Sequence, residues 1–146
     1  MKLKIIFFSL FFLLSVTGTV SAQDKKVSTS IISSTTTIKK YHELKELQGM
    51  KKAELMELYI ERINVLVKTL PYIALVTKPG VTLADLGIPN DNKKALIQQA
   101  ESTNDFLDVT LDFHKKMVPY SDTNNLIAAI LFYENTMKSL HEFNEM

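Results

Sequence analysis

The chain has 146 residues, of which 17 are Lys or Arg and 16 are Asp or Glu, and it contains neither Cys nor Trp. The lack of cysteine excludes disulfide frameworks, thiolate metal sites, cysteine nucleophiles and groups attached through cysteine, such as a lipoprotein anchor or a c-type haem. The formal net charge of +1 is too small for the basic surface that nucleic-acid binding requires, so we expect no nucleic-acid partner. Apolar residues make up 46% of the chain, which is typical of globular proteins rather than disordered ones.

Residues 1–22 have the features of a secretory signal peptide. Lys2 and Lys4 supply a short positive region, the following 12 residues are apolar apart from two serines, and small residues end the segment at Ala22. The alternative is an uncleaved membrane anchor, but an apolar run that spans a bilayer takes about 20 residues. We therefore expect cleavage between Ala22 and Gln23, with export to the periplasm or the extracellular space and no stable membrane insertion of the mature chain. Loss of the two lysines leaves 15 basic and 16 acidic residues, a net charge near −1.

Residues 23–38 form a segment rich in Ser and Thr. Eight of the ten residues 28–37 carry a hydroxyl group, and such side chains compete for backbone hydrogen bonds and disfavour a helix. A β-strand is the alternative, since Thr and Ile favour extended structure, but no second strand-like run is available to pair with it. Because Ile31 and Ile32 are too few to form a core, we expect a disordered linker that leads into a helical-bundle domain over residues 39–146.

Apolar residues recur at helical spacing from Tyr41 onward. The clearest stripe consists of Leu55, Tyr59, Ile63, Leu66, Leu70 and Ile73. Gly49 costs about 1 kcal/mol inside a helix, yet no capping residue precedes Met50, and a helix that began there would set Lys51 and Lys52 against its positive end. We therefore expect one long helix, weakened at Gly49, in preference to two helices.

Pro71 marks the end of this first helical pattern. Its ring removes a backbone donor and clashes with the preceding turn, so the helix either ends near Thr69 or kinks and continues to about Val76. The main loop follows over residues 77–92 and holds two of the four prolines and two of the four glycines. Within it, residues 82–85 resemble a capped short turn of helix.

A second helix is predicted over about residues 91–117, and a third over about residues 122–144. Their candidate N-terminal caps are Asn90 or Asp91 and Ser121 or Asp122. Their inward stripes consist of Leu96, Ala100, Thr103, Leu107, Thr110, Leu111 and His114 in the second helix, and of Leu126, Ile130, Tyr133, Met137 and Leu140 in the third. The connection over residues 119–121 is so short that the two helices must be antiparallel neighbours. The fold class expected is all-α, an up-down antiparallel bundle of three long helices, or of four if one of them breaks.

Four carboxylates form a narrow strip on the second predicted helix. Glu101, Asp105, Asp108 and Asp112 recur at spacings of four, three and four residues. A divalent-cation site or a surface for a cationic partner is one interpretation. However, Ca²⁺ normally takes six or more oxygens from a loop that wraps around it, and a straight strip cannot converge in that way. We therefore interpret the strip as a solvated face of the helix.

The histidines offer the only other candidate chemistry. A haem site could be built from Met50 or Met56 with His114 or His141, but a histidine on an apolar face is more commonly a hydrogen-bonded core or boundary residue. The Glu-x-x-His motif of carboxylate metal sites in helix bundles does not occur in the sequence. His42 has polar neighbours, yet adjacent residues on a helix point apart, and no glycine pattern forms a phosphate loop or a nucleophile elbow. We predict no catalytic, cofactor-binding or metal-binding residues.

The third predicted helix is apolar around much of its circumference between Leu126 and Tyr133. Such a helix is usually buried on several sides, so central burial is the preferred interpretation and contact with a partner is the alternative. Together with export, this pattern predicts a non-enzymatic helical-bundle protein of the cell envelope that binds another macromolecule or associates with itself. The alternative is a carrier of a small ligand, metal or haem in the bundle interior. An enzyme ranks third, because no reaction is indicated.

Overall fold

The computed structural model describes residues 29–142, and this part of the chain is all-α, as predicted. Its α-helices are α2 (Leu44–Gln48), α3 (Lys52–Thr69), α4 (Lys93–Met117) and α5 (Thr123–Glu142), and its short 3₁₀ turns are η1 (Leu70–Tyr72), η2 (Asn90–Asn92) and η3 (Val118–Tyr120). Within residues 29–142 the only extended pairing is an isolated antiparallel bridge between Ser30 and Thr82. The predicted signal peptide, the first part of the predicted linker (residues 23–28) and residues 143–146 lie outside the described residues.

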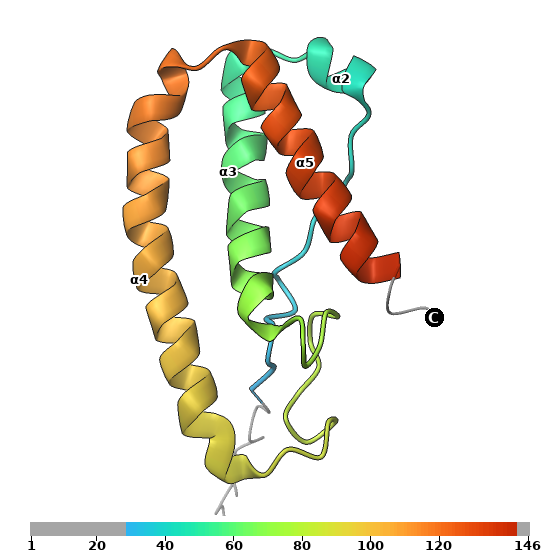
Figure 1. Cartoon of the computed structure of the whole chain (residues 1–146), viewed down its shortest axis with the longest axis vertical. Helices are drawn as coiled ribbons and strands as arrows, with labels where there is room; N and C mark the ends of the chain where they lie inside the picture. The colour runs from blue at the N-terminus through green and yellow to red at the C-terminus, as the bar shows by residue number, and fades with distance from the viewer. Residues whose placement is uncertain (1–28, 143–146) are drawn as a thin grey trace, which may run out of the picture.

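Helix α3 occupies the centre of the arrangement (Figure 1). It packs against both α4 and α5, whereas α4 and α5 diverge from each other, and α5 is inclined to α3. The preferred interpretation of the sequence placed the last helix at the centre, and the structure places α3 there instead. The reason is that α3 is buried at adjacent positions, 62–63 and 65–66, which point to different sides of a helix. The apolar residues Leu126, Ile127 and Ile130 of α5 pack against α2 and α3.

The prediction of one long helix through Gly49 was wrong, because the chain breaks there into α2 and α3. Lys51 is extended, with φ −71° and ψ 151°, and its backbone N–H donates to Glu54 Oε2 at 2.8 Å. Glu54 thus supplies the cap that no residue before Met50 could provide, and its charge suits the positive end of α3. The break turns α2 back over the end of the helices, where Leu47 is completely buried.

Helix α3 ends at Thr69, and Pro71 lies in the η1 turn that follows it. Of the two outcomes left open by the sequence, the structure therefore shows termination and not a kinked continuation. In the loop that follows, Thr82 and Asp85 form the expected capped turn. The Thr82 backbone N–H donates to Asp85 Oδ2 at 2.8 Å, and Gly87 ends the turn with a positive φ of 67°, a conformation that favours glycine.

Residues 29–38, predicted to be part of a disordered linker, pack against the helical body. Ile31, Ile32 and Ile38 are buried in two hydrophobic clusters, and each isoleucine contributes about 1.5–3 kcal/mol through burial. The backbone finds its partners in the long loop, since the Ile31 N–H donates to the Val81 carbonyl and the Gly80 N–H donates to the Ile32 carbonyl, both at 2.8 Å. A loop, and not a second strand, therefore provides the pairing that the sequence pattern did not reveal.

Helices α4 and α5 lie close to their predicted bounds. Asp122 caps α5, because its Oδ1 accepts the Asn124 N–H at 2.7 Å, whereas α4 follows the η2 turn without a side-chain cap. Leu96, Thr103 and Leu107 of the predicted α4 stripe are buried. This narrow buried stripe is the side of α4 that faces the rest of the molecule.

Leu107 tests the assignment of the faces of α4. Leu107→Ala should lower the free energy of unfolding by about 2–5 kcal/mol, because it removes a buried side chain and leaves a cavity. The matched control is the exposed neighbour, and Asp108→Ala should change the same free energy by no more than about 0.5 kcal/mol. Urea denaturation followed by circular dichroism measures both. A larger loss for the Asp108 variant would mean that the assigned faces are reversed.

Candidate functional site

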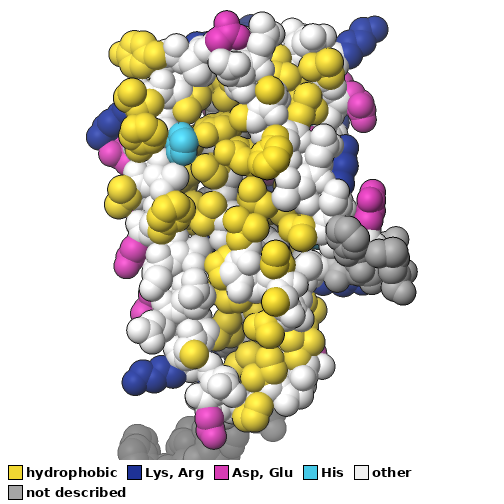
Figure 2. All heavy atoms as spheres, in the orientation of Figure 1, with side chains coloured by type: hydrophobic (Ala, Val, Ile, Leu, Met, Phe, Trp, Pro, Cys, Tyr) yellow, Lys and Arg dark blue, Asp and Glu magenta, His cyan; other side chains and the backbone are white. Residues whose placement is uncertain are grey.

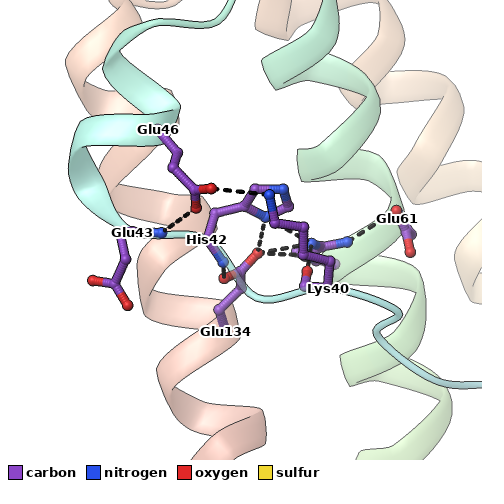
Figure 3. A network of polar contacts seen from close by, with 7 residues as sticks. Lys40, His42, Glu43, Glu46, Glu61 and Glu134 are labelled. Atoms are coloured by element: carbon purple, nitrogen blue, oxygen red, sulfur yellow. Dashed lines mark hydrogen bonds and ion pairs between the residues drawn. The ribbon is translucent and has the colours of Figure 1, made fainter.

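A buried polar network joins three segments that are distant in the sequence (Figure 3). Arg62 on α3 and Glu134 on α5 are 1% and 0% exposed, and His42, which precedes α2, is 7% exposed. Arg62 is the only arginine of the chain. Because charged side chains are almost never fully buried unless they are paired, the hydrogen bonds inside this network determine whether the fold tolerates it.

Glu134 uses both of its carboxylate oxygens in the network. Its Oε1 accepts hydrogen bonds from Arg62 Nε at 2.9 Å and Nη2 at 2.8 Å, and lies 3.0 Å from His42 Nδ1. Its Oε2 accepts the backbone N–H of His42 at 2.6 Å. Arg62 Nη2 also donates to the Lys40 carbonyl at 2.6 Å, and Nη1 pairs with Glu61 at 2.9 Å. The network therefore fastens the backbone before α2 to both α3 and α5.

The environment of Glu134 favours its ionised form. Burial raises the pKa of this carboxyl, but the hydrogen bonds from the His42 side chain and backbone, together with the Arg62 guanidinium, outweigh burial and lower the pKa below its ordinary value. A catalytic acid or base must reach the proton that it transfers, whereas Glu134 is fully buried and both of its oxygens are occupied. The arrangement is that of a structural ion pair.

The sequence carries a signal for this network, but the signal is a position on a helical stripe and not a short motif. Arg62 lies on the same helical stripe as Tyr59 and Leu66, and Glu134 lies on the same stripe as Ile130. A charged residue in phase with an apolar stripe is expected to be buried with it. Two such residues of opposite sign on different helices could have been proposed as partners.

The carboxylate strip of α4 is a solvated face, as interpreted from the sequence. Glu101, Asp105, Asp108 and Asp112 are all exposed. Asp112 forms a salt bridge with Lys116, one helical turn later, at 2.7 Å. Over residues 29–142, no group of three or more His, Cys, Asp or Glu side chains could hold a metal ion.

His114 is a half-buried residue at the contact between α4 and α3. Its Nδ1 lies 3.2 Å from the Tyr59 hydroxyl, the two rings meet edge to face at 5.3 Å, and burial lowers the pKa of His114. Met50 and Met56 pack against the hydrophobic cluster of α2, α3 and α5, and His141 lies in the last turn of α5. The geometry of His114 matches the hydrogen-bonded boundary residue favoured by the sequence.

An apolar strip on α4 and η3 is left uncovered by the described part of the chain. It consists of Phe106, Val109, Phe113, Met117 and Tyr120, and we call it the α4 apolar strip. The aromatic residues recur every seven positions, which keeps them on one side of a helix, and Phe106, Phe113 and Tyr120 are 57%, 57% and 87% exposed. Figure 2 shows hydrophobic side chains gathered across the face formed by the helices, with charged side chains mainly at its edges. An apolar centre with a polar rim is typical of protein–protein interfaces.

Comparisons with protein-family models, curated proteins and solved structures found no match to this sequence. In the segment from residue 29 to residue 142, none of the helices combines the length and the hydrophobicity needed to cross a bilayer.

Glu134→Gln should lower the free energy of unfolding by about 3–5 kcal/mol, because it removes the buried counter-charge of Arg62 and leaves only the half-exposed carboxylate of Glu61 beside the guanidinium. Asp112→Asn is the matched control, since it breaks an exposed pair with Lys116 and should cost no more than about 1 kcal/mol. Urea denaturation near neutral pH compares the two variants with the wild type. Equal losses would contradict the role assigned to the buried network.

The lowered pKa of Glu134 predicts a specific acid sensitivity. Its ionised form stabilises the fold above the ordinary glutamate pKa of about 4.3, and this contribution is lost as the pH falls through the lower pKa of the folded state. The wild type should therefore lose more stability than Glu134→Gln when urea denaturation is repeated at decreasing pH. Because all other carboxylates are shared by the two proteins, parallel stability curves would refute the prediction.

Proposed function

We propose that this chain is an exported, non-enzymatic protein of the cell envelope that associates with a second copy of itself through the α4 apolar strip. The sequence of residues 1–22 supports export, with cleavage between Ala22 and Gln23 and release of the mature chain into the periplasm or the extracellular space. In the proposal, the three long helices form an up-down bundle that presents the strip to the partner. The exposed strip on α4 is the observation that carries the proposal.

The size of the exposed apolar surface supports a protein partner. A fully exposed aromatic side chain presents roughly 200 Å², so the three partly covered aromatic residues of the strip together leave on the order of 400 Å² uncovered. That is within the ~300–600 Å² found for the largest apolar patch of a monomer. With Val109, Met117 and the polar rim, the surface approaches the ~800 Å² that each partner contributes to a stable interface.

The charges of α4 favour an antiparallel arrangement of two copies. Asp105 lies beside the strip in the middle of the helix, whereas Lys116 lies beside it in the last turn. An antiparallel contact brings the lysine of one copy towards the acidic residues of the other, while a parallel contact sets like charges side by side. The antiparallel contact also uses the same patch on both copies, as a two-fold symmetric dimer requires.

Phe113→Glu should abolish self-association of the mature chain, residues 23–146, because it places a charge in the middle of the α4 apolar strip. The matched control, Asn135→Glu, adds the same charge at an exposed position of α5 and should associate like the wild type. Size-exclusion chromatography with light scattering over a range of concentrations measures the mass. A wild-type protein that stays monomeric throughout that range would refute self-association, and retention of a different protein would then assign the strip to that partner.

A further inference from the structure

A polar hollow of about 240 Å³ lies between the N-terminal segment, the η1 turn and α4, and it includes none of the residues of the α4 apolar strip. Its polar lining includes Ser30, Ser33, Thr35, Thr36, Thr103 and Asn104. Lys68 and Tyr72 complete this lining from α3 and η1. The hollow is therefore rich in hydroxyl groups and contains one cationic side chain and one phenol ring.

Two groups that line the hollow have no hydrogen-bond or ion-pair partner among residues 29–142. Tyr72 is only 6% exposed as a residue, and its hydroxyl makes no hydrogen bond to any residue from 29 to 142. Burial raises the pKa of Tyr72, so the hydroxyl keeps its proton and can donate it. The hydroxyl is not a fully buried polar atom, because within residues 29–142 the only side-chain atom of that kind without a partner is Thr77 Oγ1. It therefore opens into the hollow, where it can donate a hydrogen bond to a ligand.

Lys68 is the second group without a partner. Its ammonium forms no salt bridge within the described range, and it lines both this hollow and a neighbouring one of about 220 Å³. Glu61, a carboxylate that also lines the neighbouring hollow, is already paired with Arg62 at 2.9 Å. The positive charge of Lys68 is therefore available for an anionic group.

The lining determines the chemical class of the ligand. Ser33 and Thr35 bond each other at 2.9 Å, and Thr103 donates to the Gln99 carbonyl. An apolar molecule would still leave the Tyr72 hydroxyl and the Lys68 ammonium without partners, which is costly, and a simple anion would use Lys68 but not the Tyr72 hydroxyl. The volume lies below the ~300–1,000 Å³ of sites for drug-sized ligands. We propose that this hollow binds a polyhydroxylated molecule of monosaccharide size with one negative charge, which Lys68 neutralises while Tyr72 donates a hydrogen bond.

Titration of the mature chain with three probes tests the proposal. D-glucuronate carries both the hydroxyl groups and the charge, D-glucose carries only the hydroxyl groups, and acetate carries only the charge. Saturable changes in the amide resonances of Thr103 and Asn104 should report glucuronate binding about tenfold tighter than binding of either other probe, the effect of one charge-assisted hydrogen bond. The absence of saturable binding would overturn the proposal, as would equal affinity for glucuronate and either of the simpler probes.

Two substitutions locate the site. Lys68→Gln should weaken glucuronate binding about tenfold without changing the affinity for glucose, and Tyr72→Phe should weaken the binding of both sugars, because it removes only the hydroxyl. The control is Lys94→Gln, which removes an exposed charge from α4, outside the hollow. Full glucuronate affinity in the Lys68 variant would refute the site. Since Lys68 lies outside the α4 apolar strip, the variant should keep the wild-type mass in light scattering, so this test is independent of self-association.

Discussion

The buried ion pair between Arg62 and Glu134 is the constraint on which the arrangement of the helices depends. Neither charge is tolerated alone in the interior, so α3 and α5 must meet where the two side chains lie at 2.8 Å. The pair is further satisfied by backbone groups, the N–H of His42 and the carbonyl of Lys40, and by the side chains of His42 and Glu61. The pair consequently fixes a crossing of two helices and the path of the segment that precedes α2.

The ion pair joins α3 and α5 and involves no residue of α4, so the position of α4 depends on other contacts. Helix α4 packs mainly against α3, through a narrow buried stripe that includes Leu107 and the half-buried His114. A helix held along one side by one neighbour must expose the rest of its circumference. In α4 part of that circumference is acidic and solvated, whereas the part that carries Phe106 and Phe113 is apolar. The same packing that leaves the acidic residues in water therefore leaves an apolar surface that no residue from 29 to 142 covers.

The sequence predicts the features that depend on local periodicity and misses those that depend on contacts between distant segments. The bounds of α4 and α5 follow from apolar spacing and from local capping by residues such as Asp122. The break at Gly49 is stabilised by Glu54, which caps the helix that follows the break. Ile31 and Ile32 are held in place by hydrogen bonds to a loop about fifty residues away in the sequence. The polar network is also a tertiary feature, since a charge in phase with an apolar stripe becomes interpretable only when its partner on another helix is considered.

The N-terminal segment links the buried network to the polar hollow. Its later part is held by Arg62 and Glu134 through Lys40 and His42, and its earlier part, around Ile32, is held by backbone hydrogen bonds to the long loop. Residues 30–36, which form one wall of the hollow, lie between or beside these two attachments. Loss of the ion pair would release one of the attachments, so the wall would depend on the buried isoleucines and on a few hydrogen bonds to a loop. The Arg62–Glu134 pair lies outside the hollow, yet it helps to order residues 30–36. The shape of the hollow therefore depends on this pair.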